Sequence, residues 1–160
     1  MMIFGKKGIE YIRLQSSFLT LIATVGLARL GLSLFGISDS IVRWLSLTVL
    51  LLIGMLYAAV RLHATGFGEY RHLLPVIFLQ TLLTQSFVIA GIAIAIITRK
   101  GNVFTRDENV LSGADSGGIG VGATWGHARA HVFAIVVFTL VLWALGSLVL
   151  LGVRRLKQIR

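Results

Sequence analysis

The chain has 160 residues, 56% of them hydrophobic, and a mean hydropathy of +0.90, which is more apolar surface than a soluble domain of this length can bury. The absence of cysteine excludes disulfides, thiolate catalysis and cysteine-ligated zinc or iron–sulfur centres. The formal net charge of +9 comes mostly from basic residues that border apolar segments, which indicates membrane orientation and argues against a nucleic-acid partner.

The chain begins with the segment MMIFGKKGIEYIRLQSS, which lacks the apolar core of a secretory signal peptide. Its apolar residues form only a weak helical face. We therefore expect it to be retained as an interfacial segment that leads into the first membrane span.

Four apolar segments are long enough to cross about 30 Å of hydrocarbon, which takes roughly 18 to 25 helical residues. They are residues 18–37, 44–62, 73–98 and 131–153. Short polar connections join the first three, and a long polar loop, 99–130, precedes the fourth. The sequence predicts an all-α integral membrane fold: a single transmembrane domain over 1–160, built as an up-down-up-down bundle of four helices with a long outer loop between helices three and four.

Basic residues are divided unequally between the two sides that these spans define. Nine lie on the side of the termini: Lys6, Lys7, Arg13, Arg61, Arg71, Arg154, Arg155, Lys157 and Arg160. Five lie on the other side: Arg43, Arg99, Lys100, Arg106 and Arg129. The positive-inside rule then places both termini in the cytoplasm and the long loop outside. We expect the protein to reside in a bacterial inner (cytoplasmic) membrane.

Arg29 stands inside the first predicted span, and no span contains an aspartate or glutamate that would neutralise it. An arginine at a helix centre costs roughly 2.5 to 3.5 kcal/mol on insertion scales. Its side chain either extends outward to headgroups and Asp39 or turns inward to acceptors on the third span. Small neighbouring residues permit close helix approach and favour the inward arrangement. The expected acceptors are Gln80, Thr84 and Gln85.

The same polar residues belong to a stripe in the third span, which also includes Thr81 and Ser86. Amides and hydroxyls in the hydrocarbon region need partners, so the stripe is expected to face other helices. A pore lined by this stripe in an oligomer is the alternative interpretation.

Two histidine pairs are candidate ligand sets. His127 and His131 are four residues apart on one face of a helix that we expect to begin near Thr124 as N-cap, so both imidazoles can reach one metal ion. Asp115 and Glu108 of the outer loop are candidate further ligands. The other interpretation is that both rings bond to headgroups, water or backbone. The second pair, His63 and His72, flanks a tight turn as candidate axial haem ligands, although both lie at the membrane edge.

The outer loop is rich in glycine, but its spacing does not match a phosphate-binding motif. The segment VFTRDENVL, 103–111, could form a short interfacial helix that packs over the bundle, and the loop is interpreted either as a partner-binding segment or lid, or as disordered.

The hypotheses about function depend mainly on residue types that are absent from the spans. They contain no acid, cysteine or complete catalytic constellation, so a non-enzymatic protein is favoured over an enzyme. The leading hypothesis is an accessory or structural subunit that binds other membrane proteins, further copies of itself, lipids or pigments. The alternative is a redox protein that uses a transition metal or haem at His127 and His131. The third is an oligomeric channel lined by helix three.

Overall fold

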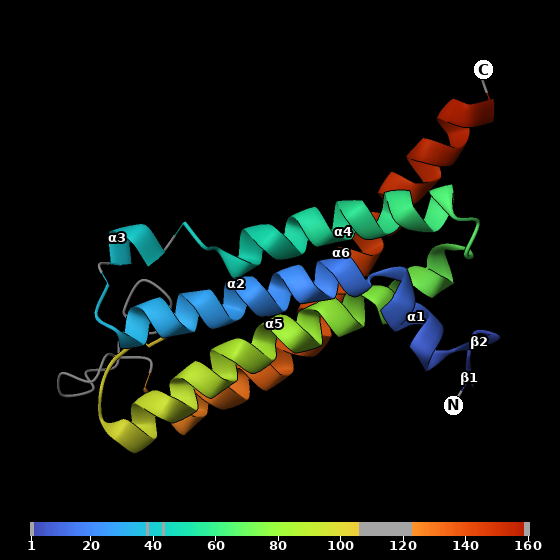
Figure 1. Ribbon diagram of the computed structural model, residues 1–160. Coiled ribbons are helices and arrows are strands. Elements are labelled where there is room, and N and C mark those ends of the chain that lie inside the picture. The colour runs from blue at the N-terminus through green and yellow to red at the C-terminus, as the bar shows by residue number, and fades with distance from the viewer. Residues whose placement is uncertain (1, 38, 43, 106–122, 159–160) are drawn as a thin grey trace.

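The computed structural model describes residues 2–37, 39–42, 44–105 and 123–158 (Figure 1). Four long helices dominate it: α2 (Ser16–Leu34), α4 (Leu47–Ala64), α5 (Tyr70–Thr98) and α6 (Trp125–Gln158). Each is long and apolar enough to cross a membrane. They alternate in direction, so the predicted all-α, four-helix integral membrane bundle is confirmed. Both chain ends lie at one end of the bundle, the termini end; the opposite end, where α2 and α5 finish, is the loop end (Figure 1).

Short elements complete the described chain. Strands β1 (Met2–Ile3) and β2 (Lys6–Lys7) form a small antiparallel hairpin, and helix α1 (Gly8–Leu14) follows. Helix α3 (Asp39–Val42) lies in the connection between α2 and α4. The hairpin was not expected from the sequence. Its turn uses positive φ angles at Phe4 (49°) and Gly5 (81°), and the glycine adopts such an angle without steric cost.

The N-terminal segment packs against the bundle through Tyr11, which is 1% exposed. The Tyr11 hydroxyl donates a 2.8 Å hydrogen bond to the carbonyl of Ile3, and its ring stacks near that of His72. Burial, reinforced by the negative charge of Glu10, raises the pKa of this phenol, so it remains a donor at neutral pH. The segment is thus a packed cap at the termini end.

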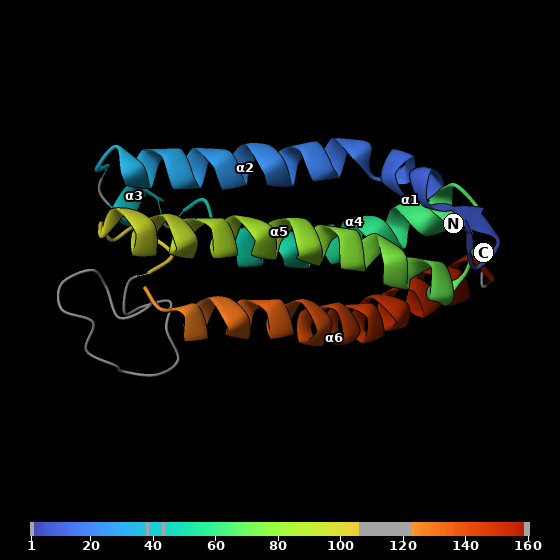
Figure 2. The same ribbon diagram turned by 90° about the horizontal axis from the view of Figure 1, so that it is seen from below.

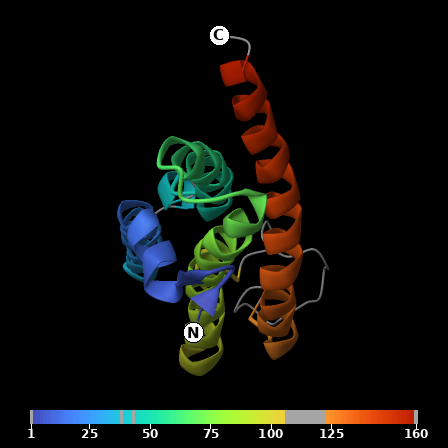
Figure 3. The same ribbon diagram turned by 90° about the vertical axis from the view of Figure 1, so that its right-hand side faces the viewer.

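Helix α5 is the centre of the bundle and packs against α2, α4 and α6. Helices α2 and α6 lie on opposite sides of it (Figure 2). Helix α6 runs beside α5 from the loop end and crosses to reach α4 near the termini end (Figures 1 and 3). Gly146 lies at this crossing, where a methyl group would come within 2.9 Å of Leu73 and 3.0 Å of Met55. The missing side chain lets three helices meet closely.

The helices do not begin and end where hydropathy placed the spans. Helix α6 begins at Trp125 and continues to Gln158, beyond both limits of the predicted span 131–153. Helix α5 begins at Tyr70, three residues before its predicted span. Hydropathy marks the part of a helix that lies in hydrocarbon, whereas backbone hydrogen bonding continues into the polar flanks.

Candidate functional site

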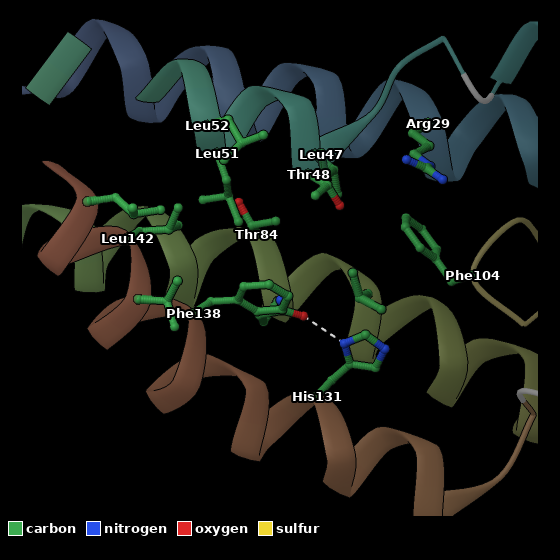
Figure 4. Close-up of a pocket in the computed structure, with 14 residues that line it drawn as sticks. Arg29, Leu47, Thr48, Leu51, Leu52, Thr84, Phe104, His131, Phe138 and Leu142 are labelled. Carbon is green, nitrogen blue, oxygen red and sulfur yellow. Dashed lines mark hydrogen bonds between the residues drawn. The ribbon is translucent and has the colours of Figure 1, made fainter. Parts of the chain in front are cut away.

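A cavity of about 310 Å³ lies between the four long helices in the half of the bundle nearer the loop end (Figure 4). It exists because α6 crosses toward α4 only near Gly146, so the two helices are separated on the loop side of that crossing. The cavity extends along α6 from His131 to Leu145. These two residues are fourteen positions apart, which is about 21 Å along a helix at a rise of 1.5 Å per residue.

Most of the cavity wall is aliphatic or aromatic. The apolar lining residues are Leu47, Leu51, Leu52, Val88, Phe104, Phe138, Val141, Leu142 and Leu145. Leu52, Val141 and Leu145 also belong to the exposed surface of the bundle, each being roughly half exposed. Since this surface faces hydrocarbon in a membrane, the cavity opens sideways between α4 and α6 toward the acyl chains.

Arg29 forms the polar end of the cavity nearest the loop end (Figure 4). Its side chain is 9% exposed, and Nη1 donates a 3.1 Å hydrogen bond to the carbonyl of Leu45. Its guanidinium lies 5.2 Å from the centre of the Phe104 ring, a cation–π arrangement. Nε is buried without a hydrogen-bond partner among the described residues. The Arg29 side chain is thus buried within the protein, as the inward alternative required.

The predicted acceptors of Arg29 were wrong. Its bond goes to the Leu45 carbonyl and to no side chain of α5. Leu45 precedes the N-cap of α4, Ser46, so its carbonyl does not take part in the helical ladder and is available to a side chain. Sequence reasoning missed this partner because any backbone carbonyl can accept, whatever its residue type.

Phe104 closes the loop end of the cavity and is held by a buried turn after α5. The Asn102 amide donates to the carbonyl of Gly91 over 2.6 Å and accepts from the backbone N–H of Phe104 over 3.0 Å. The backbone N–H of Val103 donates to the Ser33 hydroxyl of α2 over 2.7 Å. In the described part of the predicted interfacial helix, residues 103–105, the chain forms this turn instead; the remainder, 106–111, lies outside the described residues.

His131 lies at the cavity wall and connects it to His127. Its Nδ1 is 2.7 Å from Oε1 of Gln85, and its Nε2 is 3.0 Å from Nε2 of His127. The amide oxygen can only accept, so His131 donates from Nδ1 and its Nε2 carries a lone pair toward His127. The predicted N-cap is confirmed, since the backbone N–H of His127 donates to the Thr124 hydroxyl over 3.1 Å.

A metal at this pair stays a prediction. The two imidazoles share a face, as their spacing indicated. Across the part of the chain that the structure describes, no group of three or more histidine, aspartate or glutamate side chains is arranged to hold an ion. Asp115 and Glu108, the predicted further ligands, lie outside the described residues.

The polar stripe of α5 is buried among the helices at four of its five positions. Gln80, Thr81, Thr84 and Gln85 are between 0 and 4% exposed. Ser86 is exposed, and its hydroxyl bonds to the Leu82 carbonyl of its own helix, so its expected place in the interface was wrong. An intrahelical carbonyl satisfies a serine hydroxyl without any neighbouring helix. The Thr84 hydroxyl lines the cavity and has no partner among the described residues.

Gln15 is a buried polar residue of the bundle that sequence reasoning did not single out. Gln15 is 1% exposed; its amide donates to the Val76 carbonyl and accepts from Gln80 over 2.9 Å. Its place just before the first apolar run made it resemble an ordinary interfacial residue. The only sequence signal was an amide at the hydrocarbon boundary.

The other histidine pair is divided between two environments. His72 is buried at the start of α5, where its Nδ1 accepts from the backbone N–H of Glu69 over 3.0 Å. Its Nε2 donates to the carbonyl of Phe4 over 3.1 Å. His63 is partly exposed on α4. Nε2 of His72 therefore holds the N-terminal hairpin and Nδ1 caps the start of α5, and iron ligation would require one of these bonds to break.

The fold and the cavity together define a small four-helix integral membrane protein with a side-opening cavity that is apolar along most of its length and cationic at one end. Compared with protein-family models, curated proteins and solved structures, the chain gave no match.

Proposed function

We propose that this protein is a membrane accessory protein that binds a single-chain amphiphilic lipid in the cavity between α4 and α6. The observation that carries the proposal is the division of the cavity into a mostly apolar wall and a cationic end at Arg29; the other polar lining residues are Thr48, Thr84, Gln85 and His131. Of the occupants expected for an accessory subunit, this division favours a lipid over a protein partner.

The dimensions of the cavity support one acyl chain. Its volume of about 310 Å³ is at the lower end of the range for ligand pockets, roughly 300 to 1,000 Å³. Its extent along α6, about 21 Å by helical rise, exceeds half of the approximately 30 Å hydrocarbon thickness. One chain aligned with the helices would fill the apolar part and leave its headgroup beside Arg29.

The sideways opening supports entry from the bilayer. A chain that enters between Leu52 and Leu145 passes from the bilayer into a mostly apolar cavity, so its apolar surface does not return to water on the way. Arg29 lies five residues before the end of α2, about 8 Å by helical rise, so a bound headgroup stays near the membrane boundary.

Blocking the mouth of the cavity tests this function. Leu145→Trp adds bulk at a residue that lines the cavity, whereas Leu148→Trp adds the same bulk at a residue of α6 outside the lining that is 66% exposed. We expect gentle purification followed by native mass spectrometry to find bound amphiphile on the parent and on Leu148→Trp, with most of it lost from Leu145→Trp. Equal occupancy in both variants would contradict the proposal.

A transition metal held by His127 and His131 is the second candidate, because their Nε2 atoms converge to 3.0 Å. Two nitrogens about 2.0 to 2.1 Å from one tetrahedral ion lie roughly 3.3 Å apart. The bond from Nδ1 of His131 to Gln85 supports it further, since metal-bound imidazoles commonly use their other nitrogen in this way.

Metal analysis tests the second candidate. Stoichiometric metal in the purified protein that is lost in His127→Ala and in His131→Ala, but kept in the control His63→Ala, would support it. An absorption spectrum of the same sample tests for haem. Metal content unchanged in the double variant His127→Ala/His131→Ala would remove this site.

The channel interpretation receives less support than either candidate. The side chains that would line the pore, including Gln80 and Gln85, are buried within one chain, so an oligomer would not gather them around an axis without reopening the bundle.

For orientation we propose cytoplasmic termini in a bacterial inner membrane, on the basic-residue distribution. Single cysteines introduced at Ser116 and at Gln158 would be tested with a membrane-impermeant reagent on intact cells. Labelling at 116 alone is expected, and labelling at 158 alone would reverse the orientation.

A further inference from the structure

We infer that the headgroup held by this cavity is an anionic carboxylate, so that the occupant is a long-chain fatty acid with its carboxylate on Arg29 and its chain along α6. This inference rests on the proposed lipid-binding function and specifies the chemistry of its ligand.

The first support is a buried charge that has no carboxylate partner among the described side chains. Arg29 is 91% buried, since 9% of its surface is exposed, and it lies within an apolar span. Among the side chains that the structure describes, the carboxylates are those of Glu10 and Glu69, and both lie at the termini end. A buried cation without a counter-charge is costly, and an anionic ligand would remove that cost.

The second support is the hydrogen-bonding capacity left at the cavity. Nη1 of Arg29 is used by the Leu45 carbonyl, whereas Nε is buried without a partner among the described residues. The planar edge of a guanidinium that contains Nε matches the two oxygens of a carboxylate.

The third support is the direction of the cavity. Arg29 and Phe104 lie at the end near the membrane boundary, and the leucines of α4 and α6 extend from there toward the bilayer interior (Figure 4). A fatty acid bound in this direction keeps its charged group at the boundary and its chain in hydrocarbon, which is also its orientation in a bilayer.

The test compares three probes with the same sixteen-carbon chain: palmitate, neutral hexadecanol and palmitoyl lysophosphatidic acid. Delipidated protein in a neutral detergent is titrated with each and followed by native mass spectrometry. We expect palmitate to bind one per chain and at least about tenfold more tightly than hexadecanol, the scale of a charge-assisted hydrogen bond. Equal affinity for hexadecanol, or tighter binding of the phosphate probe, would overturn the carboxylate assignment.

Substitutions at Arg29 test whether this residue causes the preference for palmitate. Arg29→Gln should abolish the preference for palmitate over hexadecanol, and Arg29→Lys, which keeps the cation, should retain it. The matched control Arg129→Gln removes a charge from an exposed residue at the same end of the bundle and should bind as the parent does. A preference that persists in Arg29→Gln would overturn the inference.

The outcomes separate this inference from the proposed function. If the parent binds hexadecanol as tightly as palmitate, and Leu145→Trp abolishes both, the cavity binds lipid and only the carboxylate assignment fails. If the parent binds none of the three probes, both fail.

Discussion

The termini half and the loop half of the bundle differ in how their helices meet. Near the termini end, α6 reaches α4 and α5 at Gly146, and the buried amides of Gln15 and Gln80 bond to each other. Near the loop end, α4 and α6 are separated by a cavity, and Arg29 and Thr84 keep buried polar atoms without described partners. The first region is arranged for helix packing. The second is arranged around a cavity, as a binding site would be. Buried polar atoms without described partners occur in both regions, since Oε1 of Gln80 and the Ser147 hydroxyl also have none.

This difference between the halves indicates which part of the bundle stabilises the fold and which part is available for binding. Apolar burial drives helix association weakly in lipid, so close packing and polar contacts must hold the helices together. Both halves contain polar contacts between elements, but only the termini half also has the close approach of α6 at Gly146, whereas α4 and α6 stay apart around the cavity in the loop half. Changes in the termini half should therefore affect folding, and changes in the loop half should affect binding.

The largest expected effect is on the helix crossing at Gly146. Gly146→Leu forces side-chain atoms into space occupied by Leu73 and Met55, and overpacking of this kind costs about 1 to 3 kcal/mol. Thermal unfolding in detergent would measure the loss. The control is Gly152→Leu, since no atom lies within 4 Å of a methyl group there. Equal stability of the two variants would mean that the crossing is not closely packed.

The next effect concerns the amide pair of the termini half. Gln80→Leu removes the 2.9 Å bond to Gln15 and leaves a buried oxygen unpaired, at a cost of about 0.6 to 1.7 kcal/mol for such bonds in membrane proteins. Gln15→Leu should lower the free energy of unfolding less in the Gln80→Leu background than in the parent, because its hydrogen-bond partner is already gone. Strict additivity in this double-mutant cycle would show that the amides are not coupled.

The smallest change in stability is expected in the loop half, where the substitution should leave stability unchanged or raise it. The Thr84 hydroxyl has no described partner, so Thr84→Val removes a buried polar group without breaking a bond. Lipid-free protein should be equally stable or more stable by up to about 1 kcal/mol. The control is Thr139→Val, which loses a 2.6 Å bond to the Ile135 carbonyl. A clear loss of stability in Thr84→Val would show that this hydroxyl serves the fold.

The sequence predicted the helices better than the contacts that their side chains make. Span number, alternation and the N-cap at Thr124 follow from hydropathy and local capping rules, which depend on neighbouring residues alone. The burial of Gln80, Thr84 and Gln85 followed from the cost of polar groups in hydrocarbon. The same reasoning misplaced Ser86, because it did not consider that a serine can bond within its own helix.

The candidate site was predictable only in its components. Arg29 and His131 were both singled out from the sequence, but for unrelated roles. Arg29 was predicted to anchor helices to one another, and His131 was predicted to bind a metal. That they line one cavity depends on the crossing of α6 over the bundle. The contributions of Leu45, Phe104 and Asn102 had no sequence signal, because a carbonyl, a ring and a turn become functional only through their position.

The sequence by itself therefore determined that the chain is a four-helix membrane protein, and that an arginine and several amides must be hidden within it. The physical reason is that the cost of polar groups in hydrocarbon acts on each segment separately. Only the tertiary structure decided which groups meet. Helix α6 approaches α4 where Gly146 has no side chain and stands apart from it farther toward the loop end, where Phe138 lines the cavity. A cavity is a property of the distance between helices, and that distance is set by side chains that lie far apart in the sequence.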